Sequence, residues 1–74
     1  MTARRITEAH IRRLAEIIDG HDMLAVQMTS HGAEGMSVRV LRRGAAGGEW
    51  GRGATGDEAL DVLAVVARDW KVSQ

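Results

Sequence analysis

The stretch from Gly51 to Gly56 is the first place where residue types and spacing suggest chemistry. Its three glycines match G-x-G-x-x-G, the phosphate-binding fingerprint of dinucleotide-binding folds, and the match lies between an expected strand and an expected helix. Asp57 and Glu58 follow directly, where they would repel a phosphate from the positive end of that helix. The motif therefore predicts a glycine-rich turn into a capped helix, and we expect no nucleotide or other cofactor.

The three histidines, His10, His21 and His31, are the residues that could bind a metal ion. A catalytic zinc site takes three protein ligands that converge in space. These histidines fall on an expected helix, at its end and in a loop, without a short ligand spacing such as H-x-x-x-H. The chain has no cysteine, so it can form neither a thiolate zinc site nor a disulfide. We expect no metal site.

Nucleophilic catalysis would need a serine, and Ser30 and Ser37 both lie near histidines and carboxylates in the sequence. Neither stands in a nucleophile elbow or another known arrangement that activates a hydroxyl. A chain this short also rarely builds a pocket that encloses a substrate. We therefore expect a non-enzymatic protein and nominate no catalytic residue.

Two surface clusters are candidates for binding a partner. The arginines at 39, 42, 43 and 52 are the only local concentration of positive charge. They could form a solvated strand edge that blocks edge-to-edge pairing. They could instead form a contact patch for an acidic partner or for nucleic acid. Of these two interpretations, we favour the strand edge. On the last expected helix, Val65 and Val72 fall among charged residues on the polar side, which suggests an interface. The candidate partner-binding residues are Arg39, Leu41, Arg43, Arg52, Asp61, Val65 and Arg68.

These candidates depend on five expected elements. Apolar residues at helical spacing predict a helix over 8–19, with Thr7 as N-cap and Gly20 as its stop. Alternating patterns predict strands over 23–30 and 36–43, with Leu24, Val26 and Met28 on the buried face of the first. A third, weaker strand is expected over 49–52. The last helix runs from a capping box at Thr55 and Glu58 to about Lys71.

Composition and pattern together predict one small α+β domain over residues 1–74. Apolar residues make up 45% of the chain, and Trp50 and Trp70 are its only aromatic residues apart from histidine, so the core is aliphatic. We expect a two-layer sandwich of the order α-β-β-(β)-α, in which both helices pack on one face of a small antiparallel sheet. The formal net charge of zero gives no general attraction to nucleic acid or a membrane, and no stretch reaches the length of about 20 apolar residues that spans a bilayer.

The order of elements resembles that of the double-stranded-RNA-binding domain. The stretch Gly51-Arg52-Gly53-Ala54-Thr55 is similar to the start of that family's last helix, and His31 falls in the loop corresponding to one with which the family reaches the groove. The family opens its last helix with lysines that hold phosphates, whereas this chain has Asp57 and Glu58 there. The family's binding residues are therefore not carried over.

These observations favour a non-catalytic protein-binding module, acting through the open sheet face or the last helix. Its size and its Arg-, Ala- and Gly-rich composition suggest a bacterial or phage cytoplasmic accessory protein, such as an inhibitor of a host complex of the anti-CRISPR kind. A nucleic-acid-binding domain that uses Arg39, Arg43 and Arg52 is one alternative. A homo-oligomeric structural subunit, such as a homodimer, is the other, because small domains often gain stability by association.

Overall fold

The computed structural model describes residues 5–44 and 47–70. Its elements follow the order helix, three strands, helix, with a short 3₁₀ turn between the first two strands. The elements are α1 (Glu8–Ile18), β1 (Met23–Ser30), η1 (Gly32–Glu34), β2 (Met36–Arg42), β3 (Glu49–Gly53) and α2 (Gly56–Ala67). The expected α+β fold and element order are confirmed, and the third strand forms.

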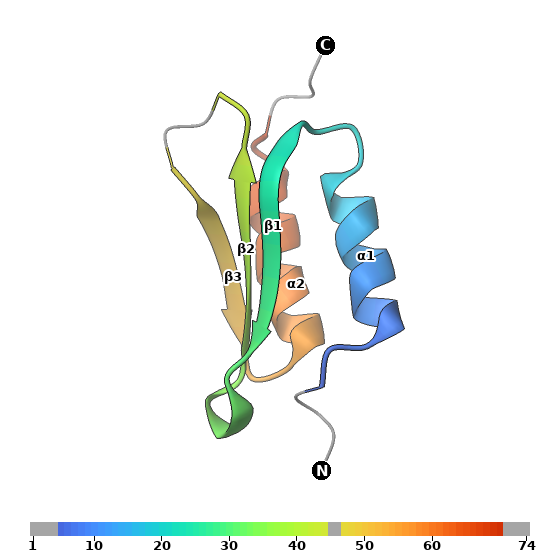
Figure 1. Ribbon diagram of the computed structural model, residues 1–74, viewed down its shortest axis with the longest axis vertical. Helices are drawn as coiled ribbons and strands as arrows, with labels where there is room; N and C mark the ends of the chain where they lie inside the picture. Colours follow the sequence, from blue (N-terminus) through green and yellow to red (C-terminus); the bar gives the residue numbers. More distant parts are fainter. Residues whose placement is uncertain (1–4, 45–46, 71–74) are drawn as a thin grey trace.

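The three strands make one antiparallel sheet with β2 in the centre. Both helices lie on one side of this sheet, with α2 against β2 and β3 and α1 alongside α2 (Figure 1). In the view of Figure 1, β1 and α1 are nearest to the reader, and β3 and α2 lie behind them. No helix of residues 5–44 and 47–70 lies on the other face of the sheet, so this part of the molecule has two layers and one open sheet face.

The core forms where β2 meets the helices. Met36, Val38 and Val40, which alternate along β2, are completely buried. They share one face of the sheet, which we call the inner face, and the alternation predicted from the sequence is confirmed there. The helices and the turn after α2 add further buried residues: Leu14, Ala59, Leu60, Leu63 and Trp70.

The three glycines of the G-x-G-x-x-G stretch are points of close contact between elements. A Cβ on Gly51 would lie 2.2 Å from the carbonyl oxygen of Ala59, and one on Gly53 would lie 2.4 Å from the Cβ of Glu58. A Cβ on Gly56 would lie 2.6 Å from the His10 ring. The first two glycines therefore let α2 approach β3, and the third lets α1 approach α2. This packing gives the motif a structural reason in place of a phosphate site.

Helix α2 ends earlier than the sequence suggests. It stops at Ala67, whereas the expected helix ran to about Lys71, which lies outside the described residues. Three successive backbone bonds of the i to i−3 type, ending with Trp70 N–H to the Ala67 carbonyl, tighten the chain after the helix. Trp70 is thereby turned into the core, where it is 7% exposed.

Both helices begin at the expected N-caps, Thr7 and Thr55, and the predicted capping box at α2 forms only in part. The Thr7 hydroxyl accepts from the His10 backbone N–H, and the His10 ring accepts from the Thr7 N–H, so a histidine completes this capping box. At α2, the Thr55 hydroxyl accepts from the Glu58 N–H. The Glu58 carboxylate accepts from the N–H of Ala54, one residue before the cap. The predicted reciprocal box at α2 is therefore only half present.

The start of β1 differs from the predicted alternation. The pairing with β2 shifts between Met23, which lies opposite Arg42, and Ala25, which lies opposite Leu41. A β-bulge of this kind adds one residue to one strand. Met23 therefore packs against the core, and Leu24, predicted to be on the buried face, is 52% exposed.

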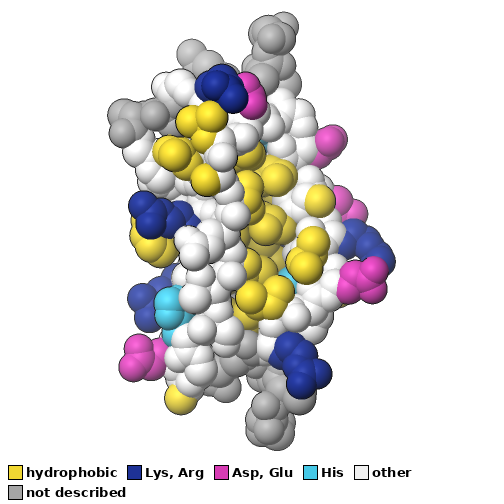
Figure 2. All heavy atoms as spheres, in the orientation of Figure 1, with side chains coloured by type: hydrophobic (Ala, Val, Ile, Leu, Met, Phe, Trp, Pro, Cys, Tyr) yellow, Lys and Arg dark blue, Asp and Glu magenta, His cyan; other side chains and the backbone are white. Residues whose placement is uncertain are grey.

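The inner face of β1 is only partly covered by the helices. Val26 and Met28 lie opposite the buried Val40 and Val38, yet Val26 is 38% exposed and Met28 is half-buried. The cause is the close docking of α2 on β3, at the far side of the sheet from β1. Apolar side chains consequently form an open stripe between β1 and α1 in the view of Figure 2.

Candidate functional site

The open face of the sheet, which we call the outer face, is built from the strand positions that alternate with the core. By the strand register its members are Ala25, Gln27, Thr29, Ser37, Arg39, Leu41, Trp50 and Arg52. None of these strand residues is acidic, and two are arginines. The outer face is therefore uncharged or positive along its strands, although the chain as a whole has no net charge.

Arg39 and Trp50 form the most exposed contact on the outer face. They lie opposite each other on β2 and β3, and the guanidinium carbon of Arg39 is 4.9 Å from the centre of the Trp50 ring. This distance is typical of a cation–π contact. Trp50 is nevertheless 54% exposed, and Arg39 and Arg52 have no ion-pair partner within the part of the chain that the structure describes.

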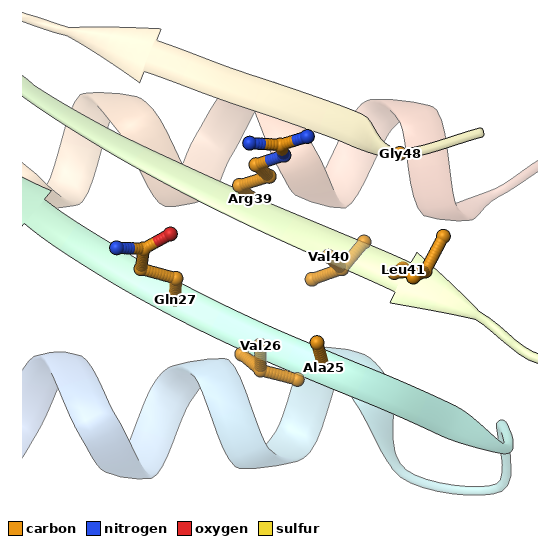
Figure 3. A pocket seen from close by; sticks show the side chains of 7 residues that line it. All are labelled: Ala25, Val26, Gln27, Arg39, Val40, Leu41 and Gly48. Atoms are coloured by element: carbon orange, nitrogen blue, oxygen red, sulfur yellow. The ribbon is translucent and has the colours of Figure 1, made fainter.

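A shallow hollow of about 220 Å³ lies beside this stacked pair. Figure 3 shows Arg39 and Gln27 side by side above the sheet, and Leu41 and Ala25 further along the same two strands. The residues that line the hollow are Ala25, Val26, Gln27, Arg39, Val40, Leu41 and Gly48. The hollow thus joins an apolar floor to one guanidinium and one amide, which suits a side chain or short segment of a partner better than a whole substrate.

The arginine cluster predicted from the sequence divides between three places. Arg39 and Arg52 share the outer face, whereas Arg42 turns to the inner side, where it bonds to Glu49 at 2.8 Å and lies over the Trp70 ring. Arg43, beyond the end of β2, pairs with Asp22 at 2.7 Å. The strand-edge interpretation is wrong for Arg39 and Arg42, because β2 is the central strand.

The candidate residues on α2 do not lie with those on the sheet. Asp61 accepts a hydrogen bond from the Arg13 guanidinium, so this carboxylate is used to hold α1. Val65 is 57% exposed and Arg68, at the C-cap, is also exposed. They are on the helical side of the molecule, which makes α2 a second, separate candidate surface; Val72 lies outside the described residues.

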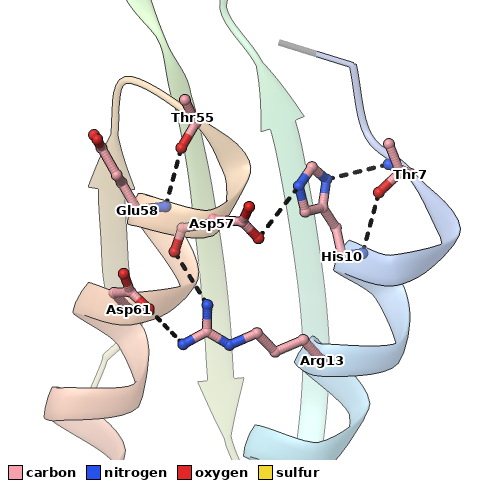
Figure 4. A network of polar contacts seen from close by, with 7 residues as sticks. All are labelled: Thr7, His10, Arg13, Thr55, Asp57, Glu58 and Asp61. Atoms are coloured by element: carbon pink, nitrogen blue, oxygen red, sulfur yellow. Dashed lines mark hydrogen bonds and ion pairs between the residues drawn. The ribbon is translucent and has the colours of Figure 1, made fainter. Parts of the chain in front are cut away.

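A polar network joins α1 to the start of α2 (Figure 4). His10 is 9% exposed, its Nδ1 accepts from Thr7, and its Nε2 lies 3.7 Å from the Asp57 carboxylate. Because Nδ1 accepts a hydrogen bond, the proton of the neutral ring is on Nε2, facing Asp57. Arg13 also donates to the Asp57 carbonyl at 3.3 Å. These side chains bond to one another between packed helices, so the arrangement is structural.

Ser37 and His31 form a contact that could, by type, activate a nucleophile. The His31 Nε2 and the Ser37 Oγ are 2.8 Å apart, yet Ser37 is only 4% exposed. No carboxylate among the described residues bonds to the other ring nitrogen, which a catalytic triad would need. His31 also closes the turn before β2 through its backbone bond to Gly35. The contact secures the β1–β2 connection.

Neither a cluster of metal-ligand side chains nor a membrane-crossing helix occurs in the described parts of the chain. Over residues 5–44 and 47–70, no three histidine or acidic side chains group closely enough to hold a metal ion. No helix in the same ranges has the length and apolar character needed to cross a bilayer.

The sequence matches no protein-family model, and neither the curated proteins nor the solved structures give a significant match. The resemblance to the double-stranded-RNA-binding domain therefore remains one of element order.

The candidates named from the sequence include Arg39, Leu41 and Arg52 of the outer face. The sequence pattern also puts Gln27 on the open face of the sheet, because it stands between Val26 and Met28. Trp50 was missed, although it stands two residues before Arg52 on the third strand and alternation alone could have placed it there. Pairing Trp50 with Arg39, however, depends on the register between two strands, which no local pattern fixes.

Proposed function

We propose that this protein is a non-catalytic protein-binding module that takes an acidic segment of its partner on the outer face of the sheet. An accessory or inhibitory role, in which a small domain covers a site on a larger complex, agrees with this mode of binding. The observation that supports the proposal most directly is the exposed Trp50 between two arginines that lack acidic neighbours. Tryptophan and arginine are the residues most enriched among those that dominate binding energy at protein interfaces.

The arrangement of these residues also indicates the chemistry of the partner. Arg39 and Arg52 can each donate two hydrogen bonds to a carboxylate in a bidentate contact, and no acidic side chain on the outer-face strands competes for them. Leu41 and Ala25 give the hollow an apolar part next to Arg39. A partner segment with acidic residues next to an apolar one would meet both features.

A nucleic acid is the second candidate ligand, and one observation favours it. An exposed aromatic ring on an open, positive sheet face is the kind of platform on which single-stranded nucleic acids stack their bases. Here Trp50 is the only aromatic ring on the outer-face strands, and Arg39 already lies over it. Helix α2 carries exposed acidic residues, including Asp57 and Asp61, which would repel a nucleic acid. The geometry therefore favours a protein over a nucleic acid.

Affinity capture from host lysate with matched charge-reversal variants tests the proposed surface. The variant Arg39→Glu/Arg52→Glu should lose the captured protein, because it replaces both unpaired cations on the outer face. The variant Arg68→Glu changes another exposed arginine, on α2, and should keep the captured protein. Capture that survives the double change but fails with Arg68→Glu would place the interface on α2 and contradict the proposal.

Fluorescence anisotropy with labelled single-stranded RNA, single-stranded DNA and duplexes tests the nucleic-acid candidate. We expect no binding at low salt. Binding that weakens steeply as salt rises, and that Arg39→Glu/Arg52→Glu abolishes, would replace the protein-binding proposal with the nucleic-acid one.

A further inference from the structure

The side of the molecule formed by β1 and α1 presents a second surface, distinct from the outer face. We call it the β1–α1 face; it consists of the free edge of β1, the open stripe of Figure 2 and the adjoining side of α1. Its most exposed apolar residues are Ile11, Leu24 and Val26, at 59%, 52% and 38%. Ile18 and Met28 beside them are half-buried and pack against the core.

The two edges of the sheet are built differently. The β3 edge is five residues long, includes Glu49 and Arg52, and lies under α2 at close range. Charges, short length and a covering helix are the ways in which proteins prevent pairing at an edge. The β1 edge is eight residues long and includes no charged residue, no proline and no glycine. Apart from the bulge near Leu24, none of the usual protective features is present in β1.

Helix α1 has an exposed apolar flank. At 100° per residue, Ile11, Ala15 and Ile18 lie together on this flank, next to the buried Leu14. Ile11 and Ala15 are exposed. In the view of Figure 1, α1 lies next to β1, whose outer edge pairs with no other strand among the described residues.

We infer that the β1–α1 face binds a second copy of this chain, in a two-fold dimer that pairs β1 with β1. Antiparallel pairing about a two-fold axis perpendicular to the sheet makes one continuous sheet across both copies. The same axis keeps both pairs of helices on one side of that sheet. It therefore brings the α1 flank of one copy against that of the other, and closes the open stripe from both sides.

The charge of β1 favours a second copy over a different partner. The strand Met23–Ser30 is uncharged, so two copies of β1 can pair without charge repulsion, and β1 offers no charged group to select a charged partner. A stable interface buries about 800 Å² on each partner, roughly a sixth of the 4966 Å² accessible surface of this chain. The α1 flank adds apolar surface to the pairing of the two strands, so the contact is not limited to the strand edge.

Light scattering coupled to size-exclusion chromatography tests the dimer. The weakest interfaces of this size have dissociation constants in the micromolar range. At a protein concentration of about 100 µM, which is above that range, the wild-type protein should therefore have twice the 8.0 kDa mass of the chain. Val26→Lys, which points a charge into the stripe, and Ile11→Lys on α1 should both give the monomer mass. Both positions are already exposed, so circular dichroism should show an unchanged fold.

Val65→Lys is the matched control, because Val65 on α2 is exposed to 57%, nearly as much as Ile11. This variant should remain a dimer. Hydrogen exchange adds a readout at the strand itself: the outward amides of β1 should be protected in the wild type and exchange rapidly in Val26→Lys. A monomeric wild type, a mass above two chains, or a dimer that survives both stripe variants would overturn the inference.

Discussion

Arg42 and Arg43 are sequence neighbours of one residue type, and the structure gives them different roles. The Arg42 side chain is 25% exposed, bonds to Glu49 at 2.8 Å and lies 5.0 Å from the centre of the Trp70 ring. It links the end of β2 to the start of β3 and to the turn after α2. The Arg43 side chain is 63% exposed, and its ion pair with Asp22 is at the surface.

We therefore expect Arg42→Ala to destabilise the fold by about 1–3 kcal/mol, because it removes a charged hydrogen bond and leaves Glu49 partly buried without this partner. Arg43→Ala should cost less than about 1 kcal/mol, as exposed ion pairs usually do. Urea denaturation of the two variants measures the difference. Equal losses would mean that the inner position of Arg42 has no energetic consequence.

At the scale of elements, the position of α2 depends on glycines in β3. A side chain at position 51 would meet the backbone of α2, both at the Ala59 carbonyl and at the Leu63 amide, which cannot move without shifting the helix. Gly51→Ala should therefore destabilise the protein by about 1–3 kcal/mol or more, since overpacking at backbone contacts is not easily relieved.

Gly47→Ala is the control for that change. A Cβ there would meet nothing within 4 Å, and Gly47 is not among the glycines with positive φ, so this substitution should leave the unfolding midpoint unchanged or raise it slightly. Equal stability of Gly51→Ala and Gly47→Ala in urea would contradict the close docking of α2 on β3.

The same elements show how far the sequence predicts this molecule. Alternation and helical spacing predicted the order of elements, the bounds of β1 and the core face of β2, because these depend on local periodicity. At the bulge near Leu24 the side chains stop alternating between the two faces of the sheet, although apolar residues still occur at every second position of the sequence. The close approach at Gly51 and the stacking of Arg39 on Trp50 depend on which elements become neighbours, and a single strand or helix does not encode that.

At the scale of the whole molecule, the two open surfaces have different chemistry. The outer face includes unpaired arginines and an exposed tryptophan, whereas the β1–α1 face is apolar with an uncharged strand edge. In the proposed dimer, the two-fold axis leaves both outer faces on the same side of the continuous sheet. A dimer would therefore present two copies of the proposed partner-binding surface side by side, and self-association would raise its avidity for a partner with repeated acidic segments.

The proposed dimer would also make the stability of the fold depend on protein concentration. A domain of this size buries only about 60% of its unfolded surface, so closing the apolar stripe would add a large fraction of its stability. If unfolding separates the two chains, each tenfold rise in concentration favours the folded dimer by about 1.4 kcal/mol, which raises its melting temperature by about 3–5 °C. Calorimetry across a hundredfold concentration range measures this shift. Ile11→Lys should melt at one temperature throughout the range, and Val65→Lys should follow the wild type. A wild-type melting temperature that does not change with concentration would show that the folded chain gains no stability from a second copy.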